Sequence, residues 1–94
     1  MDVKDVNKAA GFSPEKMKKT GLFQTERVAC DVYGLEPGQA QKVHAHDDQD
    51  KIYMVLGGQA KVKVGGDEQT LGPNQIVIAP AGEEHGFPTP ARNG

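Results

Sequence analysis

Cysteine is almost absent from the chain, which contains Cys30 alone. One cysteine cannot form a disulfide within the chain. The sequence also lacks any run of about 20 apolar residues, the length that a membrane-spanning helix needs. The first residues, Met1 to Asp5, lack the charged-then-apolar layout of a secretory signal. These absences exclude a membrane-spanning helix and favour a cytoplasmic protein.

Charge of one sign is also scarce. Eleven Lys and Arg residues balance thirteen Asp and Glu residues, which leaves a formal net charge of −2. No basic block interrupts this balance, and binding to nucleic acid or to an anionic membrane depends on such blocks. The composition therefore predicts partners other than nucleic acids and membranes.

Aromatic residues are few. The 94 residues include three Phe, two Tyr and no Trp, and only 36% of the chain is hydrophobic. A chain of this length forms one domain and has little apolar surface for a self-sufficient core. We therefore predict a homodimer in which a second copy covers outward-facing apolar residues such as Tyr53 and Val55.

Alternation with a period of two dominates the chain from residue 26 onward. Apolar and polar residues alternate in short segments separated by turns every few residues, a pattern typical of an all-β barrel or sandwich. Turns are predicted at Glu36-Pro37-Gly38, Gly65-Gly66-Asp67, Gly72-Pro73-Asn74 and Pro80-Ala81-Gly82. The strands expected between them cover residues 28–33, 41–46, 51–56, 60–64, 68–71 and 75–79, with His85 early in a last strand.

The first 25 residues differ from the rest because they are polar and mixed. Ser13 can cap a short helix that has Pro14 in its first turn, and Gly21 would end it. We therefore predict two segments within one domain: an N-terminal arm with a short helix over 1–25 and a β-barrel over 26–94. Cys30 falls on a predicted barrel strand, where a small buried hydrophobic residue is favoured over a reactive thiol.

Histidine is the residue that points to function. The chain has only three, and two of them, His44 and His46, are separated by one residue on a predicted strand. Residues two apart on a strand point to the same face, so both imidazoles can reach one point. Asp50 follows shortly after and adds a carboxylate. Imidazole and carboxylate groups are ligands of divalent metals, so this segment is a candidate metal site.

The spacing around these histidines is a motif. Five residues separate Gly38 from His44, three separate His46 from Asp50, and six separate Asp50 from Gly57. Further along the chain stands a second pattern, Pro80-Ala81-Gly82-Glu83-Glu84-His85. In this pair of motifs the sequence resembles the cupin family. The resemblance implies a double-stranded β-helix, or jelly-roll barrel, in which His44, His46, His85 and the residue at position 50 would bind a metal.

Three positions depart from the family's motifs. Asp50 stands where the family usually has Glu, Asn74 where the second motif begins with Gly, and Thr89 where that motif ends with Asn. Asn tolerates a positive φ angle better than most residues, so Asn74 can serve in a turn. Asp50 is one methylene shorter than Glu. It can bind the metal directly, bind it through a water molecule, or serve only as a hydrogen-bond acceptor.

The expected ligands suit one divalent transition metal, which can be Zn, Fe, Mn, Ni, Co or Cu. Counting alternate residues from Asp50 places Ile52 and Met54 inward as pocket walls and Tyr53 outward. Asp47 and Asp48 would add negative charge near the metal.

The reaction is less constrained than the site, because one fold hosts many functions. An open metal in an apolar pocket favours a dioxygenase-like enzyme acting on a small enolic or carboxylate substrate. The alternative is a non-catalytic module that binds a metal or a small ligand, or acts as a sensor. A sugar isomerase or epimerase is disfavoured, since no positive cluster on the barrel strands would hold a phosphosugar.

Overall fold

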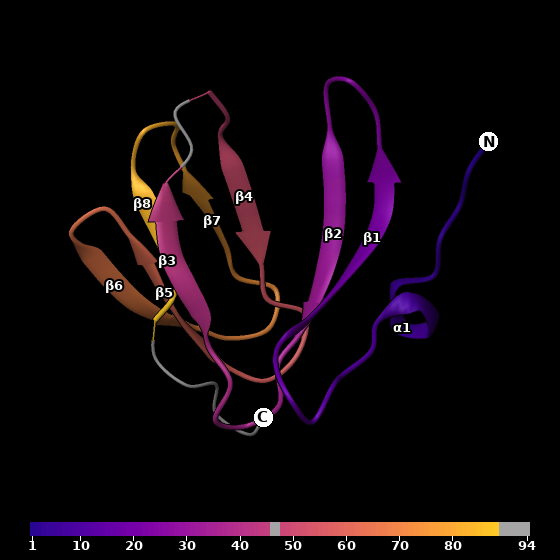
Figure 1. The fold of residues 1–94 in the computed structure, drawn as a ribbon, viewed down its shortest axis with the longest axis horizontal. Helices are drawn as coiled ribbons and strands as arrows, with labels where there is room; N and C mark the ends of the chain where they lie inside the picture. Colours follow the sequence, from indigo (N-terminus) through magenta and orange to yellow (C-terminus); the bar gives the residue numbers. More distant parts are fainter. Residues whose placement is uncertain (46–47, 89–94) are drawn as a thin grey trace. The chain divides into compact units, whose positions relative to one another are not determined.

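The computed structural model describes residues 1–45 and 48–88 of the chain. These residues belong to two compact units, 1–36 and 37–94, and each is described by itself. The predicted boundary between residues 25 and 26 stays a prediction. The all-β fold is confirmed, because strands dominate both units and the described residues contain one short helix (Figure 1).

The first unit begins with the short helix α1 (Val6–Ala9). Asp5 caps it, and its Oδ1 accepts hydrogen bonds from the backbone N–H groups of Asn7 and Lys8 at 3.0 and 3.3 Å. The helix predicted to start at Ser13 is therefore wrong in place. The Ser13 hydroxyl accepts the N–H of Glu15 in a local turn, and the following residues are extended instead.

A β-hairpin completes this unit. Strands β1 (Lys18–Gln24) and β2 (Ala29–Gly34) pair antiparallel, with a bulge between Gly21 and Phe23. Thr25 holds the turn, because its hydroxyl accepts the N–H groups of Arg27 and Val28. Cys30 lies on β2 and is exposed, so its predicted burial is wrong. The pairing partner of β2 is β1, in a sheet of two strands, rather than a barrel strand.

The second unit is built from strands that form two sheets. One sheet has the order β3-β8-β5-β6 and the other pairs β4 with β7 (Figure 1). The bounds of the strands are β3 (Gln41–Ala45), β4 (Lys51–Met54), β5 (Ala60–Val64), β6 (Asp67–Leu71), β7 (Ile76–Ala79) and β8 (Glu84–Phe87). Adjacent strands in these sheets are antiparallel.

The turns of this unit lie where the sequence predicts them. Gly65 and Gly66 join β5 to β6, and Gly65 has a φ of 58°. Asn74 has a φ of 68° and donates its N–H to the carbonyl of Val55 at 2.8 Å. Gly82 has a φ of 87° in the turn that leads into β8. The expectation that Asn74 tolerates a left-handed turn is therefore confirmed.

The interior of this unit is small. Its buried apolar residues are Tyr53, Val62, Leu71, Ala79 and Phe87. Within the described residues, no helix has the length and apolar character needed to cross a membrane.

The predicted inward direction of Ile52 and Met54 is wrong. Their side chains are 63% and 53% exposed, whereas Tyr53 between them is 7% exposed and faces the interior. Strand β4 begins at Lys51, so Asp50 belongs to the preceding loop. Counting alternate residues from a loop position shifts the pattern by one residue and exchanges the two faces.

Candidate functional site

Two of the three histidines meet in the second unit. His44 on β3 and His85 on β8 are directly opposite each other in the antiparallel pairing. Their ring centroids are 4.6 Å apart, and the planes are inclined by 64°. His85 is buried, with 1% exposure, whereas His44 is partly exposed. Residues far apart in sequence thus place two imidazoles side by side, and we call this arrangement the histidine pair.

Backbone hydrogen bonds orient both rings. Nδ1 of His44 lies 2.9 Å from the carbonyl oxygen of Lys42, and Nδ1 of His85 lies 3.2 Å from that of Glu83. A carbonyl oxygen can only accept, so each Nδ1 carries the proton. In a neutral imidazole, Nε2 then carries the lone pair. This arrangement is typical of metal-binding histidines, in which a second contact fixes the tautomer and the ring direction.

The predicted ligand set is only partly described. His46 and Asp47 lie outside the described residues, as does Thr89. Among residues 1–45 and 48–88, no group of three or more His, Cys, Asp or Glu side chains is arranged to hold a metal. The structure thus brings together two of the four predicted ligands, His44 and His85.

Asp50 has a structural contact of its own. Its Oδ1 accepts the backbone N–H of Ala81 at 2.9 Å. Ala81 lies in the turn of the second motif, so this bond ties the loop after the first motif to the turn that precedes His85. Of the three roles open to Asp50 from sequence, the hydrogen-bond acceptor is the one with a partner among the described residues.

We expect Asp50→Ala to lower the free energy of unfolding of the metal-free protein by about 1 kcal/mol, because one hydrogen bond is lost. Asp50→Asn keeps an oxygen at Oδ1 and should lose less than half of that. Urea denaturation in the presence of a chelator measures both values. Equal unfolding midpoints for Asp50→Ala and the parent would show that the Ala81 contact does not stabilise the fold.

Aromatic and amide side chains adjoin the histidine pair. The ring of Tyr53 lies 6.0 Å from that of His85 and 4.9 Å from that of Phe87, measured between centroids. The Tyr53 hydroxyl donates to Oε1 of Gln41 at 3.4 Å. Sequence reasoning missed Tyr53 and Gln41 as site residues. Alternation gives no signal for Tyr53, because Lys51 at the start of β4 shares its face and a lysine is expected to point outward.

The pairing of the strands extends the site into a row. His44 is opposite His85, His85 is opposite Val64, and Val64 is opposite Asp67. Residues directly opposite each other in adjacent strands point to the same face of a sheet. The row therefore runs from the histidine pair to the β6 edge of the four-stranded sheet.

Comparison with known sequences identifies a domain type. A family model described as "Cupin domain" matches residues 31–92. The match covers both sequence motifs and both members of the histidine pair. It begins in β2 and extends past the last described residue.

Solved structures and curated proteins give further similarities. The TT1209 protein of Thermus thermophilus is 46% identical, with a TM-score of 0.89 over 97% of this chain and 90% of that one. A Klebsiella pneumoniae protein with a double-stranded β-helix domain is 24% identical, with a TM-score of 0.84 over 97% and 84% of the two chains. Mannose-1-phosphate guanylyltransferase of Escherichia coli is 29% identical over 70 residues, which are 74% of this chain and 14% of that enzyme.

Proposed function

Because the chain belongs to the cupin family, we propose that its histidine pair is part of a metal centre that binds one divalent transition metal. The observation that carries the proposal is the approach of His44 and His85 with both Nδ1 atoms bonded to backbone carbonyls. Nε2 of each ring is the proposed metal ligand. His46 and Asp50 are the proposed further ligands, and Asp50 would use the carboxylate oxygen that does not accept from Ala81.

The donor set fits such a metal. Neutral imidazole suits Zn, Fe, Mn, Ni, Co and Cu, and backbone hydrogen bonds at Nδ1 raise the basicity of the ligating nitrogen. A metal bound there would supply Lewis acidity and, if it is redox-active, a means of activating dioxygen. Tyr53 and Phe87 would shield one side of the site from water, and the Tyr53–Gln41 pair would offer polar contacts to a ligand.

The proposed reaction is oxygenation of a small organic substrate. The Nδ1 atoms of His44 and His85 contact backbone carbonyls, which fixes in each ring the tautomer that ligates a metal through Nε2. This favours a role for both rings as metal ligands over a role as general bases. The non-catalytic alternative, a module that binds a metal and a small ligand, uses the same residues. We favour the enzyme because the site would combine an open-sided metal with aromatic walls.

The names of the curated relatives suggest a second ligand class. The name mannose-1-phosphate guanylyltransferase contains a phosphorylated sugar, and an anionic phosphate is usually held by Arg, Lys or a helix N-terminus. Among the described side chains, the rings of Tyr53 and Phe87 adjoin the histidine pair, and the Lys51 ammonium lies 5.2 Å from the centroid of the Tyr53 ring. The aromatic wall suits an organic ligand with an apolar body, and Lys51 supplies one cation rather than the cluster of cations that a phosphosugar would favour.

Metal analysis of the purified protein, followed by oxygen-uptake measurements, tests the proposal. Protein loaded with Fe(II), Mn(II), Ni(II) or Cu(II) should consume oxygen with one of a panel of enolic substrates, and His85→Ala should lose that uptake. Stoichiometric metal without uptake would select the binding module. Absence of any stoichiometric metal would reject the metal centre.

We also propose that the outer face of β4 and β7 pairs two copies of the chain. Ile52 is opposite Ile78, and Met54 is opposite Ile76, and all four side chains are more than half exposed. A two-fold interface must be complementary to itself, and an uncharged apolar face can meet its own copy without like-charge repulsion. This face replaces Tyr53 and Val55 as the predicted interface.

Light scattering should therefore give twice the chain mass of 10.1 kDa. Ile52→Glu should give a monomer, because it would bury like charges against each other. Thr70→Glu, on the exposed part of β6, is the matched control and should leave the dimer intact. A monomeric parent protein at the same concentration would reject the interface.

A further inference from the structure

A groove runs along the open seam between the two sheets of the second unit. It lies where β6, the edge strand of one sheet, faces β7 of the other, and its volume is about 290 Å³. That volume is at the small end of the range for ligand sites. Its apolar wall is formed by Val62, Val64, Leu71, Val77, Ile78 and Pro80.

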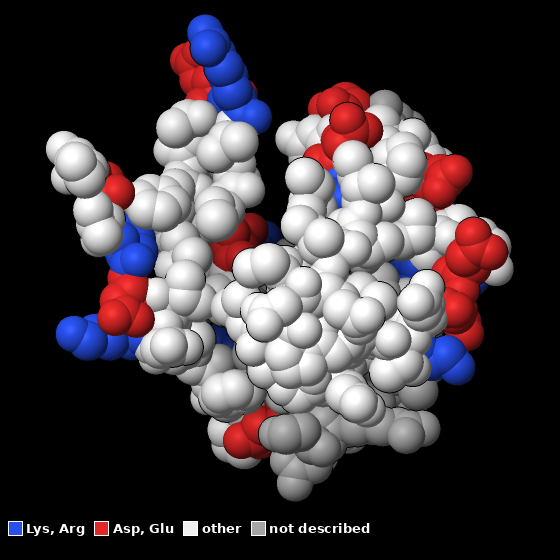
Figure 2. All heavy atoms as spheres, turned by 180° about the vertical axis from the view of Figure 1, so that it is seen from behind, with Lys and Arg blue, Asp and Glu red and all other residues white. Residues whose placement is uncertain are grey.

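The charged residues of the groove all have one sign. Among the described residues, its lining includes Asp67, Glu68 and Glu83 but no lysine or arginine. Acidic side chains gather on the right-hand side of Figure 2, the side on which β5 and β6 lie. Glu83 lies over the hairpin turn, with Oε2 3.0 Å from the position that a Cβ on Gly65 would occupy. A larger residue at position 65 would displace this carboxylate.

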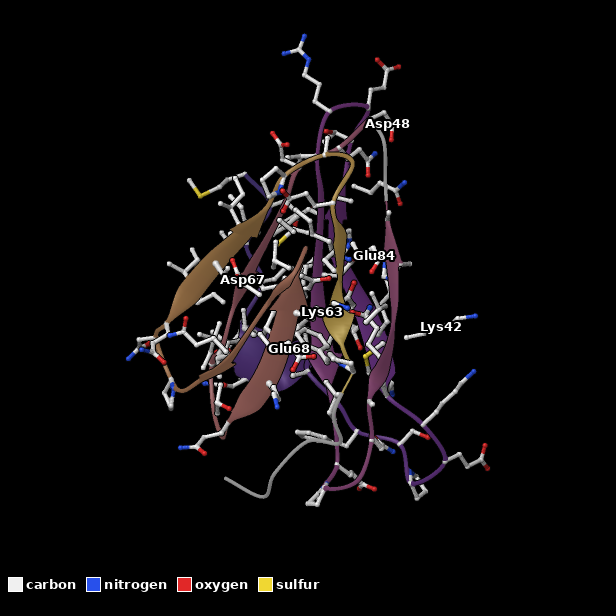
Figure 3. The ribbon with its side chains drawn as sticks, turned by 90° about the vertical axis from the view of Figure 1, so that its left-hand side faces the viewer. Lys42, Asp48, Lys63, Asp67, Glu68 and Glu84 are labelled. Atoms are coloured by element: carbon white, nitrogen blue, oxygen red, sulfur yellow. The ribbon has the colours of Figure 1, made fainter. Side chains whose placement is uncertain are left out.

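Nearby lysines form ion pairs with some carboxylates of this region but not with others. Lys61 pairs with Glu68 at 3.5 Å, and Lys63 pairs with Glu84 at 3.7 Å. Figure 3 labels Lys63, Glu68 and Glu84, together with Asp67. In the part of the chain that the structure describes, no lysine or arginine lies within ion-pair distance of Asp67 or Glu83. Two of the three described carboxylates of the groove lining, Asp67 and Glu83, thus have no lysine or arginine to offset their charge.

The position of Asp67 connects the groove to the strand row. Asp67 is opposite Val64, and Val64 is opposite His85. Val64 and Asp67 both line the groove, so an apolar wall and a carboxylate lie side by side at its β6 end. An uncompensated carboxylate beside apolar surface is complementary to a ligand that joins an ammonium group to a hydrocarbon body.

We propose that this groove binds a small organic cation, namely a primary amine with an apolar body, with Asp67 and Glu83 as the partners of its ammonium group. The apolar wall receives the hydrocarbon part of the ligand, and the acidic side chains of the described lining repel anionic ligands. The site goes beyond the metal centre and does not depend on a bound metal.

Titration of the protein with three probes of the same length tests the proposal: n-hexylammonium, n-hexanol and hexanoate. Backbone amide NMR shifts report the binding of each. Hexylammonium should shift the amides of Val64 and Asp67 and bind about tenfold more tightly than hexanoate, because two exposed carboxylates contribute. Added salt should weaken hexylammonium binding and leave hexanol unchanged.

The double variant Asp67→Asn with Glu83→Gln should bind hexylammonium about tenfold more weakly, to the level of hexanol. Glu84→Gln is the matched control, since Glu84 is paired with Lys63 and is not part of the described groove lining. Unchanged hexylammonium affinity in the double variant, equal affinity for hexanoate, or no binding of any probe would overturn the proposal. If the double variant His44→Ala with His85→Ala still binds the amine, the groove site is independent of the proposed metal centre.

Discussion

Replacement of His44 and His85 together by alanine is expected to abolish stoichiometric metal binding. Both proposed ligand nitrogens of the histidine pair are then lost, and the remaining proposed ligands, His46 and Asp50, provide too few donors for a tight site. The metal-to-protein ratio after dialysis, measured by elemental analysis, should fall from about one to near zero. Added metal should raise the melting temperature of the parent protein and have no effect on the variant, because only the folded parent binds it.

Lys42→Ala is the matched control for this experiment. The Lys42 side chain is exposed on β3, and its backbone carbonyl, which accepts from His44, remains in place. This variant should keep the metal and its thermal shift. Circular dichroism and cooperative urea unfolding verify that each variant is folded. A double histidine variant that is folded and still binds one metal equivalent as tightly as the parent would contradict the proposed centre.

Among glycine-to-alanine substitutions near the histidine pair, we expect Gly86→Ala to lower the free energy of unfolding the most. A Cβ at position 86 would lie 3.0 Å from the carbonyl oxygen of Lys42 and 3.0 Å from Cα of Val43. Both are backbone atoms of β3, so the strand itself must move. Overpacking of this kind costs about 2 kcal/mol. Because His44 and His85 flank this contact, we also expect weaker metal binding.

Gly66→Ala controls for the general effect of replacing a glycine. A Cβ at Gly66 would have no described atom within 4 Å, so its effect on the free energy of unfolding should be small. Urea unfolding of both variants without metal measures the difference. If Gly86→Ala is as stable as Gly66→Ala, strands β3 and β8 have more room than the described contacts allow.

Much of the second unit could be predicted because its local signals agree with one another. The alternation in β5 and the Gly65-Gly66 turn both specify a hairpin, and the structure contains it. The first unit offered weaker signals. Ser13 followed by Pro14 fits a helix start, but Lys18–Gln24 pairs with β2 instead, because extended pairing outweighs the local preference of a short segment.

The histidine pair could be predicted from spacing, but its surroundings could not. Two motifs place His44 and His85 in one site whatever the details of the loops. A shift of one residue in the starting point exchanges the two faces of β4. Starting the alternation at Asp50, which precedes the strand, therefore assigns Ile52 and Met54 to the interior in place of Tyr53. The acidic groove could not be predicted, because its residues on β6 and in the turn before β8 come together only through strand pairing.

The asparagine in the left-handed turn at position 74 affects the conformational entropy of the unfolded chain as well as the geometry of the folded one. Glycine explores more backbone conformations than asparagine before folding, so more entropy is lost when it is fixed. Asparagine reaches a φ of 68° at modest cost and starts from a narrower ensemble. Asparagine at this motif position therefore adds a small steric penalty in the folded chain. It also reduces the entropy that the chain loses on folding, and the turn is retained.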